Sequence, residues 1–241
     1  MLKVALLVGI NYIGQECSLQ GCINDVQNVR KLLLESGYLE QNIVMLTDET
    51  PVKPTRQNII KALVDLILSD AQKMVFHYSG HGSYETDCNG DEKDGRDECL
   101  VPLDCDTAGM ILDDEIRGIL QLVQPHQELF TLMDCCHSGT NMDLAYNLHQ
   151  RVGRRTMTMV RDSGVSETRG QVVMISGCQD SQYSADAIID DSAGGAMTCA
   201  FLKSYAPGKK YVKLMADMFE FLEKNDYPQV PNLSSGKSLN L

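Results

Sequence analysis

The chain has 241 residues, 43% of them hydrophobic, so it can form one large α/β domain or two small ones with a filled core. Its net charge of −12 argues against nucleic acid as a partner, because little in the composition offsets phosphate repulsion. No apolar run reaches the roughly 18 residues that span a bilayer, so no membrane partner is expected. The nine cysteines are an odd number and lack the regular spacing of a disulfide framework, so we expect reduced thiols and a cytoplasmic location.

Short apolar runs along the chain predict buried strands, the first of them KVALLVGI at 3–10. This run lacks a small-residue cleavage site, so we interpret it as a strand rather than as part of a signal peptide. The predicted strands cover residues 3–10, 42–48, 73–80, 129–135 and 171–178.

Apolar residues at helical spacing lie between these strands and predict helices. Thr55 is the expected N-cap of the second helix, and Asp113 and Asp114 suit the start of the third. The alternation of strands and helices predicts a mostly parallel sheet covered on both faces, with sites beyond the carboxyl ends of the strands. The helical stripes are Val26, Val29 and Leu33; Ile59, Ile60, Leu63, Val64 and Ile67; Ile116, Ile119, Leu120 and Val123; and Met215, Met218, Phe219 and Leu222.

Two of the predicted strands end in unusual polar sequence, VFHYSGHG and TLMDCCHSG. A cysteine nucleophile needs a nearby imidazole, and His81 could meet Cys135 or Cys136 if the two strands are neighbours. Spacing alone leaves open which cysteine faces the histidine. A structural histidine and buried core cysteines are the plainer alternative. A zinc site is a weaker one, because adjacent Cys-Cys-His cannot readily supply three ligands to one ion.

Eight segments, taken in chain order, resemble the metacaspases, caspase-like cysteine proteases that cleave after Arg or Lys. The resemblance implies a caspase-like α/β/α sandwich with a mostly parallel central sheet. It also implies a large part at 1–146, an exposed Arg-rich linker at 147–170 and a small part at 171–241, together one domain. The segments are LLVGINYIG with LQGCINDVQNV, VFHYSGHGS, DECLVPLD with ILDDEI, LMDCCHSGTNMD, VVMISGCQDSQYSADA and PQVPNLSSG.

The resemblance also assigns roles to individual residues. The family histidine matches His81, and the nucleophile, the cysteine directly before His-Ser-Gly, matches Cys136. Backbone N–H groups of Gly82 and Cys136 would hold the oxyanion. The substrate pocket would contain two carboxylates, which favour a guanidinium or ammonium group, although Asp25 could instead be a helix N-terminal charge. The pocket positions implied by the resemblance are Cys22, Asp25, Ser79 and Asp134.

An acidic segment stands out between Glu85 and Glu115, where twelve Asp and Glu residues against two Lys and Arg give a net charge of −10. A solvated loop is the ordinary explanation of such a run. Similarity to the metacaspases instead implies Ca²⁺ as cofactor, because carboxylate oxygens from separate loops suit this ion. The matching ligand positions are Asp97, Asp113, Asp114 and Asp143.

The resemblance further predicts self-cleavage in the Arg-rich stretch, since an enzyme that cuts after basic residues could cut itself there. The chain begins at its first predicted strand, so we expect a minimal form without a prodomain, and a monomer that acts on proteins or peptides with basic residues. Two alternatives stay open: a catalytically silent, calcium-responsive binding module, and a calcium-independent, paracaspase-like protease. The candidate cleavage positions are Arg151, Arg154, Arg155, Arg161 and Arg169.

Overall fold

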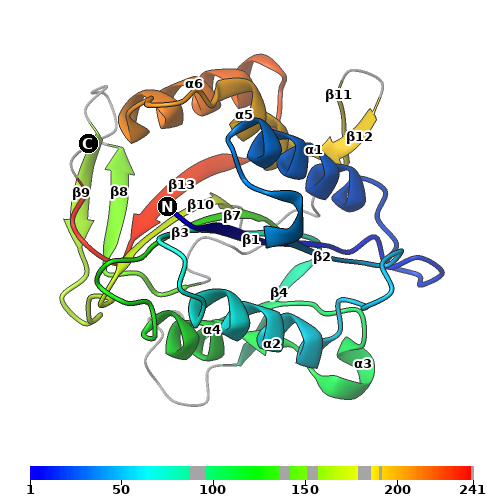
Figure 1. The fold of residues 1–241 in the computed structure, drawn as a ribbon. Helices are drawn as coiled ribbons and strands as arrows, with labels where there is room; N and C mark the ends of the chain where they lie inside the picture. The colour runs from blue at the N-terminus through cyan, green and yellow to red at the C-terminus, as the bar shows by residue number, and fades with distance from the viewer. Residues whose placement is uncertain (87–95, 136–141, 151–156, 179–185, 190–191, 240–241) are drawn as a thin grey trace.

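Eight strands form one central sheet in the computed structural model (Figure 1), which describes residues 1–86, 96–135, 142–150, 157–178, 186–189 and 192–239. The first five strands in sheet order are parallel to their neighbours, and each of the last three is antiparallel to the strand before it. In sheet order the strands are β2 (Ile43–Thr47), β1 (Lys3–Gly9), β3 (Lys73–Ser79), β7 (Glu128–Asp134), β10 (Gln171–Cys178), β13 (Val230–Ser235), β8 (Tyr146–Gln150) and β9 (Met157–Arg161).

Helices cover both faces of this sheet, so the molecule has three layers (Figure 1). One face carries α1 (Cys22–Glu35), α5 (Ala196–Ser204) and α6 (Tyr211–Lys224), and the other carries α2 (Arg56–Ile67) and α4 (Asp113–Leu120). The remaining elements are η1 (Glu40–Asn42), α3 (Cys105–Ala108), the small antiparallel sheet of β4 (Gly82–Thr86), β5 (Arg96–Leu100) and β6 (Ile111–Leu112), and the hairpin of β11 (Asp186–Ile189) and β12 (Ser192–Gly195).

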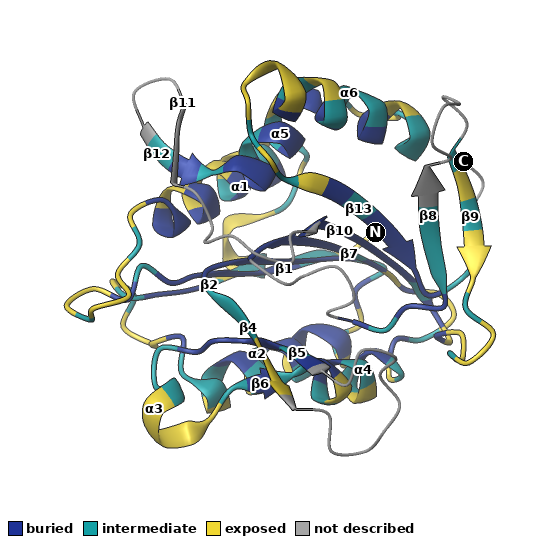
Figure 2. Cartoon of the chain, turned by 180° about the vertical axis from the view of Figure 1, so that it is seen from behind, coloured by how far each residue is buried: buried dark blue, intermediate teal, exposed yellow. Residues whose placement is uncertain are grey.

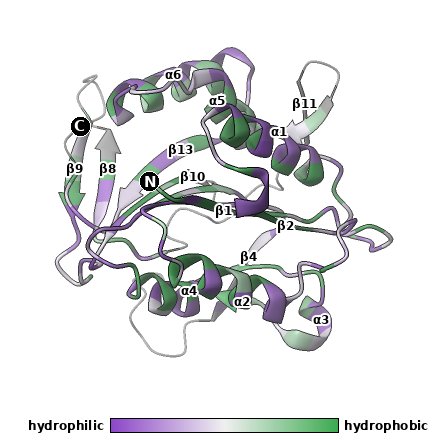
Figure 3. Cartoon of the chain, viewed as in Figure 1, coloured by the Kyte–Doolittle hydropathy of each residue, from purple (hydrophilic) through white to green (hydrophobic). Residues whose placement is uncertain are grey.

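The sheet separates two apolar cores because successive side chains of a strand point to opposite faces. In β1, Leu6 and Val8 join the core beneath α2 and α4, whereas Ala5 and Leu7 join the core beneath α1, α5 and α6. Figure 2 shows the central strands largely buried, and Figure 3 shows both hydrophobic and hydrophilic residues on each helix. Helices therefore cover most of both faces, and the ends of the strands are the natural place for polar chemistry.

The five predicted strands and the four predicted helices are all present, and the mostly parallel sheet covered on both faces is confirmed. Thr55 caps α2 as expected, its hydroxyl accepting the Asn58 N–H at 3.3 Å. Residues 147–170 need a correction: they hold β9 and most of β8, which pair with each other, while β8 also pairs with β13. This stretch is thus partly an edge of the sheet, although half of its residues with a described burial are exposed.

No helix within the described ranges is long and apolar enough to cross a membrane.

His77 is a polar exception inside the sheet. It is fully buried in β3, and its Nδ1 donates to the Leu132 carbonyl of β7 at 3.0 Å, since a carbonyl can only accept. Nε2 has no hydrogen-bond partner within the described part of the chain. Burial lowers the pKa of His77 from 6.5 to about 4, against the opposing effect of the Leu132 hydrogen bond. The imidazole is therefore neutral in the folded protein at neutral pH.

We predict that His77 makes the fold acid-sensitive between about pH 6.5 and pH 4. In this window His77 is protonated in the unfolded state and neutral in the folded state. The free energy of unfolding therefore falls as pH falls, by at most about 1.4 kcal/mol per pH unit. Urea unfolding followed by circular dichroism, at pH 5 and pH 7, measures this slope. His77→Phe should flatten it, whereas the exposed His126→Gln should not. Equal slopes in wild type and His77→Phe would contradict the prediction.

Candidate functional site

Strands β3 and β7 are adjacent and parallel along their whole length, from the pair Lys73–Glu128 to the pair Ser79–Asp134. Their carboxyl ends therefore meet at one edge of the sheet, where the Gly80 N–H donates to the Asp134 carbonyl at 3.2 Å. His81 follows β3 at this edge. Cys136, predicted to be the nucleophile, lies outside the described residues. Its neighbour Cys135 is buried in the core below α2 and α4.

The imidazole of His81 is held by a backbone carbonyl. Its Nε2 lies 2.6 Å from the Cys17 oxygen, in the loop that joins β1 to α1. A carbonyl only accepts hydrogen bonds, so Nε2 carries the proton and Nδ1 is left as an acceptor in the neutral ring. The fold thus fixes one nitrogen of the imidazole, and the lone pair of the neutral ring lies on the other. This contact could not be predicted from the sequence, because the acceptor is a backbone oxygen and does not depend on the type of residue at position 17.

The predicted pocket residues fall into one acidic cluster, which we define as Asp25, Ser79 and Asp134. Asp25 and Asp134 are 1% and 3% exposed. Asp25 also lies in the first turn of α1, so it has the position that the alternative interpretation, a helix N-terminal charge, gives it. The Ser79 hydroxyl donates to Asp25 Oδ2 at 2.7 Å, and Ser79 pairs with Asp134 across the two strands. Cys22 opens α1 one turn before Asp25 and is also buried.

Two further elements complete the acidic cluster, and sequence reasoning missed both. The Gly195 N–H at the end of β12 donates to both Asp25 oxygens, at 3.0 and 2.9 Å. The Thr198 N–H in the first turn of α5 donates to Asp134 Oδ2 at 2.7 Å. Burial raises the pKa of Asp134, while the hydrogen bonds from Thr198 work against this rise. The one available signal was the Gly194-Gly195 pair, which looks like an ordinary turn in sequence.

The aspartates predicted to bind calcium lie on neighbouring elements. Asp97 on β5 and Asp113 at the start of α4 are buried, and Asp113 accepts the N–H groups of Glu98 and Asp114 at 3.0 and 2.9 Å. Asp114 is exposed. Burial lowers the pKa of Arg117 on α4, and Asp143 lies close enough to oppose this shift. All four carboxylates are therefore placed around β5 and α4.

The donor chemistry of these four aspartates fits Ca²⁺, which prefers carboxylate oxygens from flexible positions. Within the described ranges, however, no group of three or more His, Cys, Asp or Glu side chains lies close enough together to hold a metal ion. The four aspartates thus have the right ligand atoms for the ion and lie on neighbouring elements. The described ones are not close enough together to form a complete ligand set. Calcium binding stays a prediction.

Of the arginines predicted as self-cleavage positions, Arg151, Arg154 and Arg155 lie outside the described residues. Arg161 and Arg169 are exposed. Arg161 ends β9 and pairs with Tyr146 of β8, so its backbone would have to leave the sheet before a protease could bind it. Gly82, the predicted oxyanion donor, opens β4 directly after His81.

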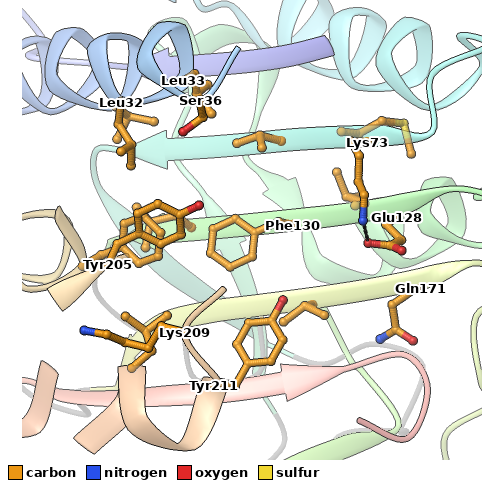
Figure 4. A pocket seen from close by; sticks show the side chains of 18 of the residues that line it. Leu32, Leu33, Ser36, Lys73, Glu128, Phe130, Gln171, Tyr205, Lys209 and Tyr211 are labelled. Carbon is orange, nitrogen blue, oxygen red and sulfur yellow. Dashed lines mark hydrogen bonds and ion pairs between the residues drawn. The ribbon is translucent and has the colours of Figure 1, made fainter. Parts of the chain in front are cut away.

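A cavity of about 690 Å³ lies far from this edge, at the opposite end of the strands (Figure 4). Its lining includes Lys73, Glu128 and Gln171, the first residues of β3, β7 and β10, and its floor includes Phe130. Lys73 and Glu128 form an ion pair there. Large cavities are the usual first guess for a binding site. None of the predicted site residues lines this one, so we place the candidate site at the carboxyl ends of the strands.

Comparison with known proteins bears on the family of the chain. A family model described as "Metacaspase, peptidase C14 domain" matches residues 3–145. The chain is 37% identical to Metacaspase-1 of Yarrowia lipolytica over 283 residues, covering 97% of this chain and 61% of that protein. It is 38% identical to Metacaspase-1 of Botryotinia fuckeliana, covering 99% of this chain and 68% of that protein. Against the first three such relatives, the chain spans 61–65% of their length.

Solved structures bear on the fold alone. A Geobacter sulfurreducens protein of known crystal structure has a TM-score of 0.70 at 22% identity, covering 100% of this chain and 95% of that one. Caspase-1 from Spodoptera frugiperda has a TM-score of 0.57 at 11% identity, covering 97% of this chain and 84% of that one. The predicted caspase-like α/β/α sandwich is therefore correct. Because the family model matches and the similarity to the two Metacaspase-1 proteins covers nearly all of this chain, the chain belongs to the metacaspases.

Proposed function

We propose that the chain is a cysteine endopeptidase in which Cys136 is the nucleophile and His81 the general base. The observation that carries the proposal is the bond between His81 Nε2 and the Cys17 carbonyl, which leaves the lone pair of the neutral ring on Nδ1. A free thiol with a pKa of about 8.5 is a weak nucleophile until a neighbouring imidazole takes its proton. Membership of a peptidase family supports the same roles.

In the proposed mechanism, His81 Nδ1 takes the thiol proton, and the Cys136 sulfur attacks the carbonyl carbon of the scissile bond. N–H groups of Gly82 and Cys136 stabilise the oxyanion of the tetrahedral intermediate. His81 then gives its proton to the departing amine, leaving a thioester on Cys136. The base next takes a proton from water, which attacks the thioester and releases the acid. The Cys17 carbonyl supports the imidazolium ring that forms twice in this cycle.

The proposed specificity is for Arg or Lys before the cleaved bond. Asp134 at the end of β7 and Asp25 in the first turn of α1 supply two buried carboxylates beside Ser79, and a guanidinium offers forked donors to such a pair. Ser79, Gly195 and Thr198 already donate to these carboxylates and so fix their direction. Remaining lone pairs can accept from a basic side chain. A substrate with an acidic residue at this position would be repelled.

We also propose self-cleavage within the Arg-rich stretch. Because Arg161 pairs with β8, cleavage there requires the edge of the sheet to open first, so we favour Arg151, Arg154 or Arg155 as the position cut.

The role of Cys136 as the nucleophile can be tested with a peptide substrate. A fluorogenic peptide amide ending in Arg should be hydrolysed by the wild type in the presence of Ca²⁺, and Cys136→Ala should reduce the rate to background, because no other thiol can attack. Cys17→Ala is the matched control: it removes a thiol beside His81 but keeps the carbonyl that binds Nε2, so it should retain activity. Full activity in Cys136→Ala would refute the proposed nucleophile. If no Arg or Lys peptide is cleaved under any condition, the binding-module alternative replaces it.

The second prediction concerns specificity. Asp134→Asn should raise KM for the Arg peptide roughly ten- to hundredfold with a smaller change in kcat, the effect of losing a charge-assisted bond of about 1.5–3 kcal/mol. Burial raises the pKa of Asp134, so its charge is lost as pH falls through that raised value. KM of the wild type should therefore rise toward acid pH, and KM of the variant should not follow. Asp65→Asn, on the exposed side of α2, is the control. An unchanged KM in Asp134→Asn would exclude Asp134 from the pocket.

The third prediction concerns calcium, which we propose binds the carboxylates of Asp97, Asp113, Asp114 and Asp143 and supports activity. Calorimetric titration of CaCl₂ into Cys136→Ala protein should give a binding isotherm, and Asp113→Asn should weaken it at least roughly tenfold through the loss of one charged ligand. Asp65→Asn should leave it unchanged. In the wild type, EGTA should abolish peptide cleavage. Cleavage that persists in EGTA, with no binding heat, would favour the calcium-independent alternative while leaving the nucleophile in place.

A further inference from the structure

Tyr12 contacts the peptide group of the candidate base His81 from beneath. Tyr12 is fully buried, and its hydroxyl accepts the His81 backbone N–H at 3.0 Å while it donates to the Val101 carbonyl at 2.6 Å. Its ring lies 4.6 Å from the imidazole, centroid to centroid, at an interplanar angle of 36°. One side chain therefore supports both the backbone and the ring of His81.

A second tyrosine completes this support on the carbonyl side. The Tyr78 hydroxyl donates to the His81 carbonyl at 2.8 Å and lies 3.3 Å from the Tyr12 hydroxyl. Gly80 permits the arrangement, since a Cβ there would lie 2.9 Å from the Tyr78 oxygen and 3.1 Å from the Tyr12 oxygen. The peptide of His81 is thus held at its N–H and at its C=O by two buried hydroxyls.

The backbone of Tyr12 is itself held in an unusual conformation. Its φ of 51° is rare for a residue with a side chain, and such conformations persist where the surroundings enforce them. The Asp48 carboxylate does so at the end of β2, accepting the N–H groups of Asn11 and Ile13 at 2.7 and 3.0 Å. The same loop continues to Cys17, whose carbonyl binds His81 Nε2.

The geometry assigns to Tyr12 the role of a positioning residue for His81. The loop of residues 11–19 holds the histidine at three points: its N–H through the Tyr12 hydroxyl, its ring face through the Tyr12 ring, and its Nε2 through the Cys17 carbonyl. This inference deepens the proposed function and rests on it. A general base must be aligned with the proton it takes, and small displacements of the base are costly in rate.

The hydroxyl of Tyr12 separates two possible roles of the residue, which are to position His81 and to fill the core. A phenylalanine would fill the same volume in the core and could keep the ring contact with the imidazole. It would leave the His81 N–H and the Val101 carbonyl without the partner that now links them. If Tyr12 served the core alone, that exchange would cost stability and nothing specific to catalysis.

Kinetics of Tyr12→Phe test the inference, with the concentration of active enzyme fixed by titration with an Arg-chloromethylketone. We expect kcat to fall roughly ten- to hundredfold while KM for the Arg peptide changes by less than about twofold, because the base is misaligned and the acidic cluster is intact. Tyr38→Phe is the matched control: it removes the hydroxyl of a partly buried tyrosine at the other end of the sheet and should leave both constants unchanged. An unchanged kcat in Tyr12→Phe would overturn the inference, as would equal losses in the two variants.

A second measurement does not depend on activity. In ¹⁵N-histidine-labelled Cys136→Ala protein, the His81 ring should give the signals of a neutral ring protonated at Nε2, assigned by their absence in His81→Gln. Adding Tyr12→Phe should broaden them or shift them toward a tautomer mixture, and adding Tyr38→Phe should not. Identical His81 signals with and without the Tyr12 hydroxyl would refute positioning. If the wild type cleaves no peptide, the proposed function fails, and this spectrum still decides the role of Tyr12.

Discussion

The candidate site depends on the parallel pairing of β3 with β7. Ser79 and Asp134 are partners at the end of this ladder, and His81 and Cys136 each stand two residues further along the chain. Because parallel strands end at the same edge, the pairing that buries Phe76 and Met133 in the core also brings Ser79 and Asp134 together, with His81 two residues beyond Ser79. A shift in this register would separate Ser79 from Asp134 and would move His81 relative to Asp134.

The acidic cluster is stable without a substrate because small groups surround it. Two buried carboxylates are costly unless hydrogen bonds compensate them, and here the donors are one hydroxyl and two backbone N–H groups. Glycine is what lets the backbone come this close: a Cβ on Gly195 would lie 2.1 Å from Asp134 Oδ2, and one on Gly194 would lie 3.0 Å from Asp25 Oδ1. Any larger residue at 195 would have to displace the carboxylate proposed to bind the basic side chain.

The strands and helices that could be predicted from the sequence are those marked by a local pattern of apolar residues. Continuous apolar runs marked β1, β3 and β7, and helical spacing marked α1, α2, α4 and α6, because these elements bury whole faces. The β8–β9 edge was hidden, since its mixed polar and apolar side chains include the exposed Val160 and Arg161. The contacts from Cys17 and Gly195 were also out of reach, because the backbone makes them and any residue type has the same carbonyl or N–H. The left-handed conformation of Tyr12 left no signal either, as it depends on Asp48, 36 positions away in the sequence.

The loop of residues 11–19 also joins the two halves of the site. Its first residue, Asn11, is anchored by Asp48 and accepts the N–H groups of Cys22 and Ile23 at 3.0 and 3.3 Å with its side-chain oxygen, so it fixes the start of α1. That helix carries Asp25 in its first turn, while the same loop holds His81 through Tyr12 and Cys17. The proposed base and one carboxylate of the acidic cluster therefore share a support. A distortion of this loop would move both, whereas a change confined to the Tyr12 hydroxyl acts on its contacts with His81, Val101 and Tyr78 and not on those of Asn11 with α1.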